Sequence, residues 1–145
     1  LITKILPYAS LLSPNLPEAA RLLNMPQAKS PEEMVLQAKQ LLGMGPEAIL
    51  MKGGHSDESI CTDVLVDTVG TFATYSCPRI DTTNTHGTGC TYAAAIAAQL
   101  ACGEDLKNAV KTAHQYLANA IKAADTLKVG RGQGPVHHFV EYWHA

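Results

Sequence analysis

The residues best suited to chemistry form a short glycine-rich segment that leads into an alanine-rich stretch. Residues 85–91 read Thr-His-Gly-Thr-Gly-Cys-Thr, and the stretch that follows predicts a helix over 91–101. The first N–H groups of a helix lack internal partners and carry the positive end of its dipole. Gly87 and Gly89 would let the backbone approach a ligand closely, with Thr88 between them. The segment therefore predicts a site for a phosphate or a developing oxyanion.

A thiol stands at the edge of this predicted anion site. Cys90 lies where the helix is expected to begin, and the positive field there would lower its pKa from about 8.5 toward roughly 3.5–7.5. A base beside an anion cradle indicates a transferase. The alternative pairs Cys90 with His86, four residues earlier, as a nucleophile for acyl transfer. The sequence shows no third group that would orient such a pair.

A second candidate site is Lys52-Gly53-Gly54-His55, which directly follows the apolar run 48–51. Such a run indicates a buried strand, and ligands of open α/β sheets gather at the carboxyl ends of strands. Lys52 could place its charge on a phosphate, while Gly53 and Gly54 would give a nucleotide close access to the backbone. A solvated lysine in a flexible turn is the alternative, and the sequence leaves both open.

Asn15-Leu16-Pro17-Glu18 also has two interpretations. Asn at the N-cap of a helix with Glu at its third position is a capping-box variant. Alternatively, the oxygens of Asn15 and Glu18 could lie near a magnesium ion, often through water. The two interpretations are compatible, because a capping residue can also reach metal-bound water.

The remaining candidates lie near the carboxyl end. Gly132 and Gly134 belong to a glycine-rich loop over 130–138 that could close on a ligand or serve as a turn. A metal site is disfavoured, because no acidic or cysteine partner stands at ligand spacing from the nearby histidines, His137, His138 and His144. We expect His114 to be partly buried and structural. Three cysteines are interpreted as small hydrophobic residues: Cys61, Cys77 and Cys102.

The elements that must position these residues alternate between strand and helix. The pattern predicts an α/β fold, with one layer of mostly parallel sheet between helices and a single domain over 1–145. The first seven residues resemble the tail of a helix, which suggests a segment of a longer protein. Strands are expected over 9–13, 48–51, 62–67 and 70–76, and helices over 16–23, 30–42, 91–101 and 105–127.

Composition narrows the class of protein. The 145 residues are 46% hydrophobic and 17% charged, with a net charge of −2, which is typical of a soluble globular protein. The absence of a basic run and the 6% aromatic content argue against nucleic-acid binding. No stretch approaches the ~20 apolar residues of a membrane span. The four cysteines lack metal-type spacing, so reduced thiols in a cytoplasm are expected.

Four motifs, in order, resemble the hydroxymethylpyrimidine and phosphomethylpyrimidine kinases of thiamine biosynthesis, in the ribokinase-like superfamily. They are Ser13–Ala19, Lys52–His55, Thr85–Thr91 and Gly132–His138. The resemblance covers nearly the whole chain. It implies a three-layer α/β/α fold with a mostly parallel central sheet, and transfer of the ATP γ-phosphoryl group to the pyrimidine alcohol or its monophosphate.

The resemblance also assigns roles to individual residues. It implies that Gly87, Thr88 and Gly89 form an anion hole and that Cys90 is the base. Asn15 and Glu18 correspond to the Mg²⁺–water network. The nucleotide-binding set implied for ATP is Lys52, Gly53, Gly54, Thr85, Gly132 and Gly134.

Family members have an N-terminal half with no counterpart here, so the resemblance is to the nucleotide-facing C-terminal half. It implies a small-molecule pyrimidine substrate and a homodimer in the full-length protein. Two further readings remain: a pyridoxal- or pyridoxine-type kinase, and a truncated nucleotide-binding module without turnover.

Overall fold

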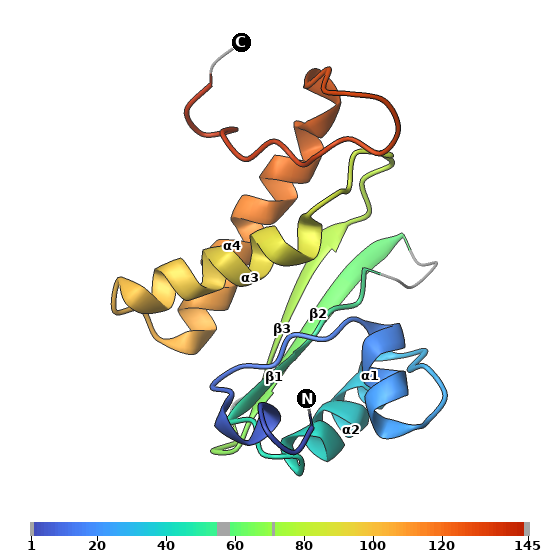
Figure 1. Cartoon of the computed structure of the whole chain (residues 1–145), viewed down its shortest axis with the longest axis vertical. Helices are drawn as coiled ribbons and strands as arrows, with labels where there is room; N and C mark the ends of the chain where they lie inside the picture. The colour runs from blue at the N-terminus through green and yellow to red at the C-terminus, as the bar shows by residue number, and fades with distance from the viewer. Residues whose placement is uncertain (1, 55–58, 71, 144–145) are drawn as a thin grey trace. The chain divides into compact units, whose positions relative to one another are not determined.

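The computed structural model describes residues 2–54, 59–70 and 72–143. The chain consists of two compact units, Leu1–Arg79 and Ile80–Ala145. Each unit is described by itself below (Figure 1). Within the described residues, no helix combines the length and apolar character needed to cross a membrane.

The first unit contains helices that precede a small sheet. A 3₁₀-helix occupies Leu6–Tyr8, and residues 2–5 form turns, so the expected helix tail at the start of the chain is wrong. The other elements are α1 (Leu16–Leu23), α2 (Pro31–Leu42), β1 (Ala48–Met51), β2 (Ile60–Asp67) and β3 (Phe72–Pro78).

The three strands are antiparallel, in the order β1-β2-β3. The expectation of a mostly parallel sheet is therefore wrong for these strands. The reason lies in the connections, because a parallel pair needs a crossover of a dozen or more residues, whereas β1 and β2 are separated by residues 52–59 alone. A tight turn joins β2 to β3, with Val69 N–H donating to Asp67 and Gly70 at φ 89°.

Parallel pairing does occur at β1, where an irregular segment runs beside it. Leu12 N–H donates to Ala48 O at 3.0 Å, and Leu50 N–H donates to Leu12 O at 2.9 Å. The segment expected as a strand over 9–13 thus follows β1 in the parallel sense through isolated bridges. Pro14 has no N–H to donate, which helps to explain why no continuous strand forms.

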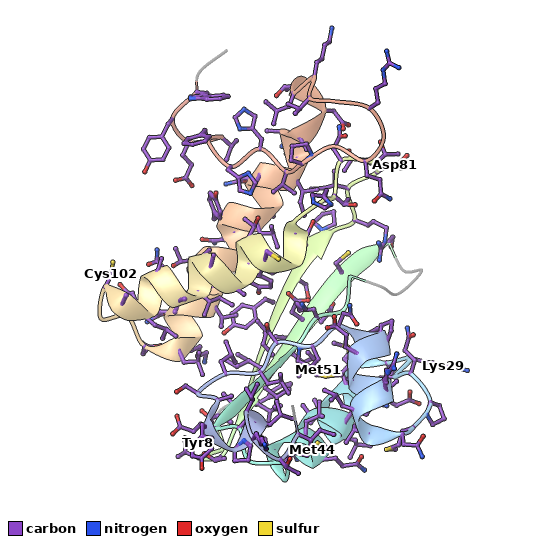
Figure 2. The ribbon with its side chains drawn as sticks, viewed as in Figure 1. Tyr8, Lys29, Met44, Met51, Asp81 and Cys102 are labelled. Atoms are coloured by element: carbon purple, nitrogen blue, oxygen red, sulfur yellow. The ribbon has the colours of Figure 1, made fainter. Side chains whose placement is uncertain are left out.

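One face of the sheet packs against α1 and α2. Ile49 and Met51 alternate with Leu50 along β1, and Val66 and Val64 stand opposite them on β2. This face joins Leu16 and Ala19 of α1 and Met34, Ala38 and Leu41 of α2 in one buried cluster. Figure 2 labels Met51 within this part of the molecule. The cluster fixes β1, and with it the residues that follow its carboxyl end.

The second unit is a helical hairpin. Its elements are α3 (Thr88–Ala101), α4 (Leu106–Lys122) and a 3₁₀-helix over Ala124–Thr126, and α3 and α4 lie side by side (Figure 1). Gly103, at φ 92°, lies in the short connection between them. The helix α3 begins three residues earlier than expected, which places Gly89 and Cys90 inside its first turn.

Candidate functional site

In the first unit the structure brings two of the predicted motifs together. Asn15 and Lys52 are partners in a parallel bridge, and Lys52 N–H donates to Pro14 O at 2.9 Å. The start of α1 therefore lies beside the residue that follows β1. Lys52 is half-buried, and no hydrogen bond or ion pair of its ammonium group occurs among the described residues.

The capping box predicted at Asn15 is confirmed. Asn15 Oδ1 accepts the Glu18 N–H, and Glu18 Oε2 accepts the Asn15 N–H, both at 2.8 Å. This pairing limits what the two side chains can offer a cation. Asn15 Oδ1 and Glu18 Oε2 each use one lone pair in the cap, whereas Oε1 of the exposed Glu18 takes no part in it. Mg²⁺ usually takes one or two carboxylates besides phosphates and water, and Glu18 fits that role.

The two glycines after Lys52 differ in their surroundings. Gly53 is buried, and a Cβ atom there would lie 2.0 Å from the backbone oxygen of Thr62. Its N–H donates to the buried Asp63 carboxylate at 2.9 Å. Gly54 is exposed with open space at its Cα, and its carbonyl accepts from Arg79 Nη1 at 3.2 Å. The turn is therefore anchored to β2 at Gly53 and is open to solvent at Gly54.

In the second unit, the start of α3 has the features of an anion site. Gly87 is the N-cap residue at φ 81°, and no side chain caps the helix. Cys90 is exposed in the first turn. Thr88 instead turns back to Thr85, whose carbonyl accepts from both the Thr88 hydroxyl and its N–H. The N–H groups of Gly89 and Cys90 are thus those that a helix leaves without internal partners.

The glycine-rich loop lies against the segment that leads into α3. His86 N–H donates to Gly134 O at 3.0 Å, and Val136 N–H donates to His86 O at 3.4 Å. Gly134 is buried, whereas Gly132 is exposed at φ 100°. Two motifs separated by more than forty residues in the sequence therefore meet at the N-terminus of α3.

Cys90 also borders a groove of about 710 Å³ between α3, α4 and the segment after the glycine-rich loop. Thr91 Oγ1 lies 2.9 Å from His138 Nε2 at this border, and the Tyr116 hydroxyl donates to His138 O at 2.8 Å. Burial raises the pKa of the Tyr116 phenol, and Glu141 adds to that rise. The groove gives Cys90 open access to a ligand.

The histidines do not assemble into a metal centre in the part of the chain that is described. His137 is buried, and its ring makes a T-shaped contact with that of Trp143. His114 is half-buried near Tyr92, as expected of a structural histidine. No hydrogen bond joins His86 to Cys90 among the described residues. The predictions that involve His55 and His144 lie outside the described residues.

The remaining cysteines differ in exposure. Cys61 and Cys77 are half-buried opposite each other on β2 and β3, and burial raises the pKa of both thiols. Cys102 is exposed at the end of α3 opposite to Cys90, where Figure 2 labels it.

Sequence reasoning missed the polar residues that hold these segments in place. Asp63 anchors Gly53, and the side chains of Thr82, Asn84 and Asp125 connect to Gly134. A buried carboxylate in an apolar strand was a usable signal for Asp63, because such a group needs hydrogen-bond partners. The sequence offers no comparable signal for Asp125, which contacts Asn84 across 41 positions.

The family model and the curated relatives that match this chain indicate the same family. Residues 1–137 match the phosphomethylpyrimidine kinase family. The hydroxymethylpyrimidine/phosphomethylpyrimidine kinase of Salmonella typhimurium is 48% identical over 140 residues, which cover 97% of this chain and 52% of the relative. That of Escherichia coli is 48% identical over 141 residues, covering 97% and 53%. The chain thus spans about half the length of the curated relatives it matches.

Solved structures agree on the fold. Staphylococcus aureus pyridoxal kinase, solved with AMP-PCP and pyridoxal, matches with a TM-score of 0.89 and 34% identity, over 97% of this chain and 52% of its own. A phosphomethylpyrimidine kinase from Clostridium difficile matches with a TM-score of 0.69 and 32% identity, over 84% and 47%. These neighbours confirm the ribokinase-like α/β class. The chain belongs to the phosphomethylpyrimidine kinase family.

Proposed function

We propose that the full-length protein uses Mg·ATP to phosphorylate 4-amino-5-hydroxymethyl-2-methylpyrimidine, its monophosphate, or both. One observation carries the proposal: an exposed thiol, Cys90, stands in the first turn of a helix whose N-terminus has no side-chain cap. That turn combines unpartnered N–H donors with a group that can accept a proton. Phosphoryl transfer to an alcohol needs both.

Cys90 is the proposed base. Its thiolate takes the hydroxyl proton of the acceptor at Sγ while the alcohol oxygen bonds to the γ-phosphorus and ADP leaves. The backbone N–H groups at Gly89 and Cys90 stabilise the charge on the transferred phosphoryl oxygens. General-base catalysis typically contributes about 10²–10⁴-fold, so loss of the thiol should reduce turnover strongly without removing nucleotide binding.

The other motifs hold the nucleotide in this proposal. Lys52 places its ammonium group on the ATP phosphates, and the open backbone at Gly54 and Gly132 allows close approach. Gly53 acts through its anchor on Asp63, which holds Lys52 in place. Glu18 would hold magnesium through Oε1, oriented by its cap with Asn15. When bound, the ion neutralises charge on the phosphates.

The comparisons support this choice of substrate. The relatives that are 48% identical carry the name hydroxymethylpyrimidine/phosphomethylpyrimidine kinase. Solved neighbours hold ADP or AMP-PCP, which supports nucleotide use. A second candidate is phosphorylation of pyridoxal, favoured by the likeness to pyridoxal kinase at a TM-score of 0.89. We further expect the full-length protein to be cytoplasmic and to form a homodimer. Light scattering after size-exclusion chromatography would test the dimer.

The test is ADP release by the full-length protein with Mg·ATP and each acceptor in turn: the pyrimidine alcohol, its monophosphate and pyridoxal. We expect turnover with a pyrimidine that falls at least 100-fold in Cys90→Ser and Lys52→Ala. Cys102→Ser is the matched control, because it changes an exposed cysteine at the other end of the same helix. Faster turnover of pyridoxal than of either pyrimidine would make pyridoxal the acceptor. ATP binding without turnover of any acceptor would indicate a nucleotide-binding module instead of a kinase.

A further inference from the structure

A four-residue polar network in the second unit connects segments that are far apart in the sequence. Asn84 Nδ2 donates to Asp125 Oδ1 at 2.8 Å, and Asn84 Oδ1 accepts the Gly134 N–H at 2.9 Å. The Thr82 hydroxyl donates to the same Asp125 oxygen, and it accepts the Asn84 N–H at 3.0 Å. Asn84 is therefore the member that joins both ends of the network.

The network lies next to the proposed nucleotide site. Gly134 belongs to the glycine-rich loop, and Asn84 stands three residues before Gly87, the N-cap of α3. Two adjacent backbone hydrogen bonds, from His86 N–H to Gly134 O and from Val136 N–H to His86 O, hold the loop beside the residue that precedes the N-cap of α3. Fixing Asn84 thus fixes the glycine-rich loop relative to the predicted anion site.

The chemistry at position 84 requires an amide. One end of the side chain must donate to a carboxylate, and the other must accept an N–H. An aspartate could accept from Gly134, but it would face Asp125 without a proton to share, and like charges at hydrogen-bond distance repel. The need for one donor and one acceptor distinguishes this contact from simple packing.

We propose that Asn84 is a positioning residue for the nucleotide, acting through Gly134 rather than by touching the substrate. This inference rests on the proposed function, because it takes the glycine-rich loop as part of the nucleotide site. Loss of the Asn84 contacts displaces the loop, which weakens ATP binding more than it slows the chemical step.

Exchanging the amide of Asn84 and the carboxylate of Asp125 tests the proposal in the full-length protein. Asn84→Asp should raise the KM for ATP about tenfold, since the loss of one charge-assisted hydrogen bond weakens an interaction by about that factor. We expect kcat and the acceptor KM to change by less than about threefold. The double variant Asn84→Asp, Asp125→Asn should recover part of the lost affinity, because the amide nitrogen introduced at position 125 can donate to the new carboxylate, while the Thr82 hydroxyl loses the oxygen to which it donates. Asp125→Asn completes the cycle and should cost less than Asn84→Asp, since its oxygen still accepts from Thr82 and Asn84.

Asn108→Asp is the matched control. Asn108 Nδ2 also donates to a carboxylate, that of Asp105 at the start of α4, at 2.7 Å. The same chemical change at that position should leave the KM for ATP unchanged. Asn84→Ala, which removes both hydrogen bonds without adding charge, should match Asn84→Asp in its KM and covers the case in which the charged variant does not fold.

Titration calorimetry with ADP distinguishes a failure of the proposed function from a failure of the proposed role of Asn84. Wild-type protein that binds ADP without turnover would overturn the proposed function, while the affinities of the variants still test Asn84. A folded Asn84→Asp or Asn84→Ala with unchanged affinity would overturn the proposal. So would a double variant no better than Asn84→Asp, or equal losses in kcat and in both KM values. Absence of ADP binding by wild-type protein would overturn both.

Discussion

Asn84 Oδ1 lies 2.2 Å from the position that a Cβ atom on Gly134 would occupy, and it accepts the N–H of that glycine at 2.9 Å. Contact with the Asn84 side chain therefore excludes a larger residue at position 134. Backbone conformation does not, since Gly134 is not among the residues with positive φ. A side chain at 134 can be accommodated only if Asn84 moves.

Gly134→Ala should destabilise the full-length protein by about 1–3 kcal/mol, the usual cost of forcing atoms into a packed site. In an Asn84→Ala background the nearest atom to the new methyl group would be the Cβ of residue 84 at 3.5 Å, an ordinary contact. The additional cost of Gly134→Ala should then fall below about 0.5 kcal/mol. Urea unfolding of the wild type, both single variants and the double variant measures this coupling. An equal cost in both backgrounds would show that Asn84 is not the obstacle.

Adjacent glycines after β1 should respond differently to the same substitution. Gly53→Ala places a methyl group 2.0 Å from the Thr62 carbonyl oxygen, which belongs to the β2 backbone and cannot turn aside. We expect a loss of about 2–3 kcal/mol in the free energy of unfolding. Gly54→Ala meets nothing within 4 Å, so it serves as the control with a change within about 0.5 kcal/mol. Similar unfolding curves for the two variants would contradict the described packing of this turn.

The two interpretations of Glu18 can be separated by Glu18→Gln. A glutamine oxygen can still accept the Asn15 N–H, so the capping box and the stability should be retained within about 0.5 kcal/mol. Magnesium binding should weaken, because the amide is a poorer ligand for this cation. The expected result is an ADP-release assay that needs several-fold more Mg²⁺ with an unchanged melting temperature.

Asn15→Ala gives the opposite pattern. Loss of a cap costs about 1 kcal/mol of stability, with the start of α1 released from its side-chain bond. If Glu18→Gln left the Mg²⁺ requirement of the wild type intact, the carboxylate would be a cap and nothing more.

Thiol reactivity should follow exposure and position in the fold. Cys90 and Cys102 are exposed, whereas Cys61 and Cys77 are half-buried. Because burial raises the pKa of Cys61 and Cys77 above the ordinary thiol value, a smaller fraction of each is thiolate at a given pH.

Brief iodoacetamide treatment of the folded protein near pH 8, followed by peptide mass mapping, should therefore label Cys90 and Cys102 first. Raising the pH toward 10 should bring up the labelling of Cys61 and Cys77. Early labelling of that pair near pH 8 would contradict the half-buried arrangement on β2 and β3. ATP protection of Cys90 but not Cys102 would add support for the nucleotide site.

Local signals in the sequence predicted several parts of the molecule correctly. The capping box at Asn15 and Glu18 is confirmed, as is the apolar strand 48–51. Each depends on interactions within one short segment, where residue type and spacing carry the information. The start of α2 shows how such local caps vary, since the Ser30 hydroxyl accepts the Glu33 N–H while the Glu33 carboxylate accepts from the Lys29 N–H.

Long-range pairing was harder to predict. The period of apolar residues indicates a strand but not the direction of its neighbour, so the antiparallel order of β1, β2 and β3 was missed. The shift of β3 from 70–76 to 72–78 has a similar cause, because the turn at Gly70 and the register with β2 together define where pairing starts.

The amino-acid sequence was sufficient for the family, the identity of the four motifs and the caps that start the helices, because these depend on residue type and short spacing. Folding was needed to bring Asn15 beside Lys52, to seat Gly53 on Asp63 and to join Asn84 with Asp125 and Gly134. Those contacts connect positions from ten to fifty residues apart. Polar groups at such separations become partners only after the strands and helices between them have packed, since their hydrogen bonds depend on distances of about 3 Å that no local pattern encodes.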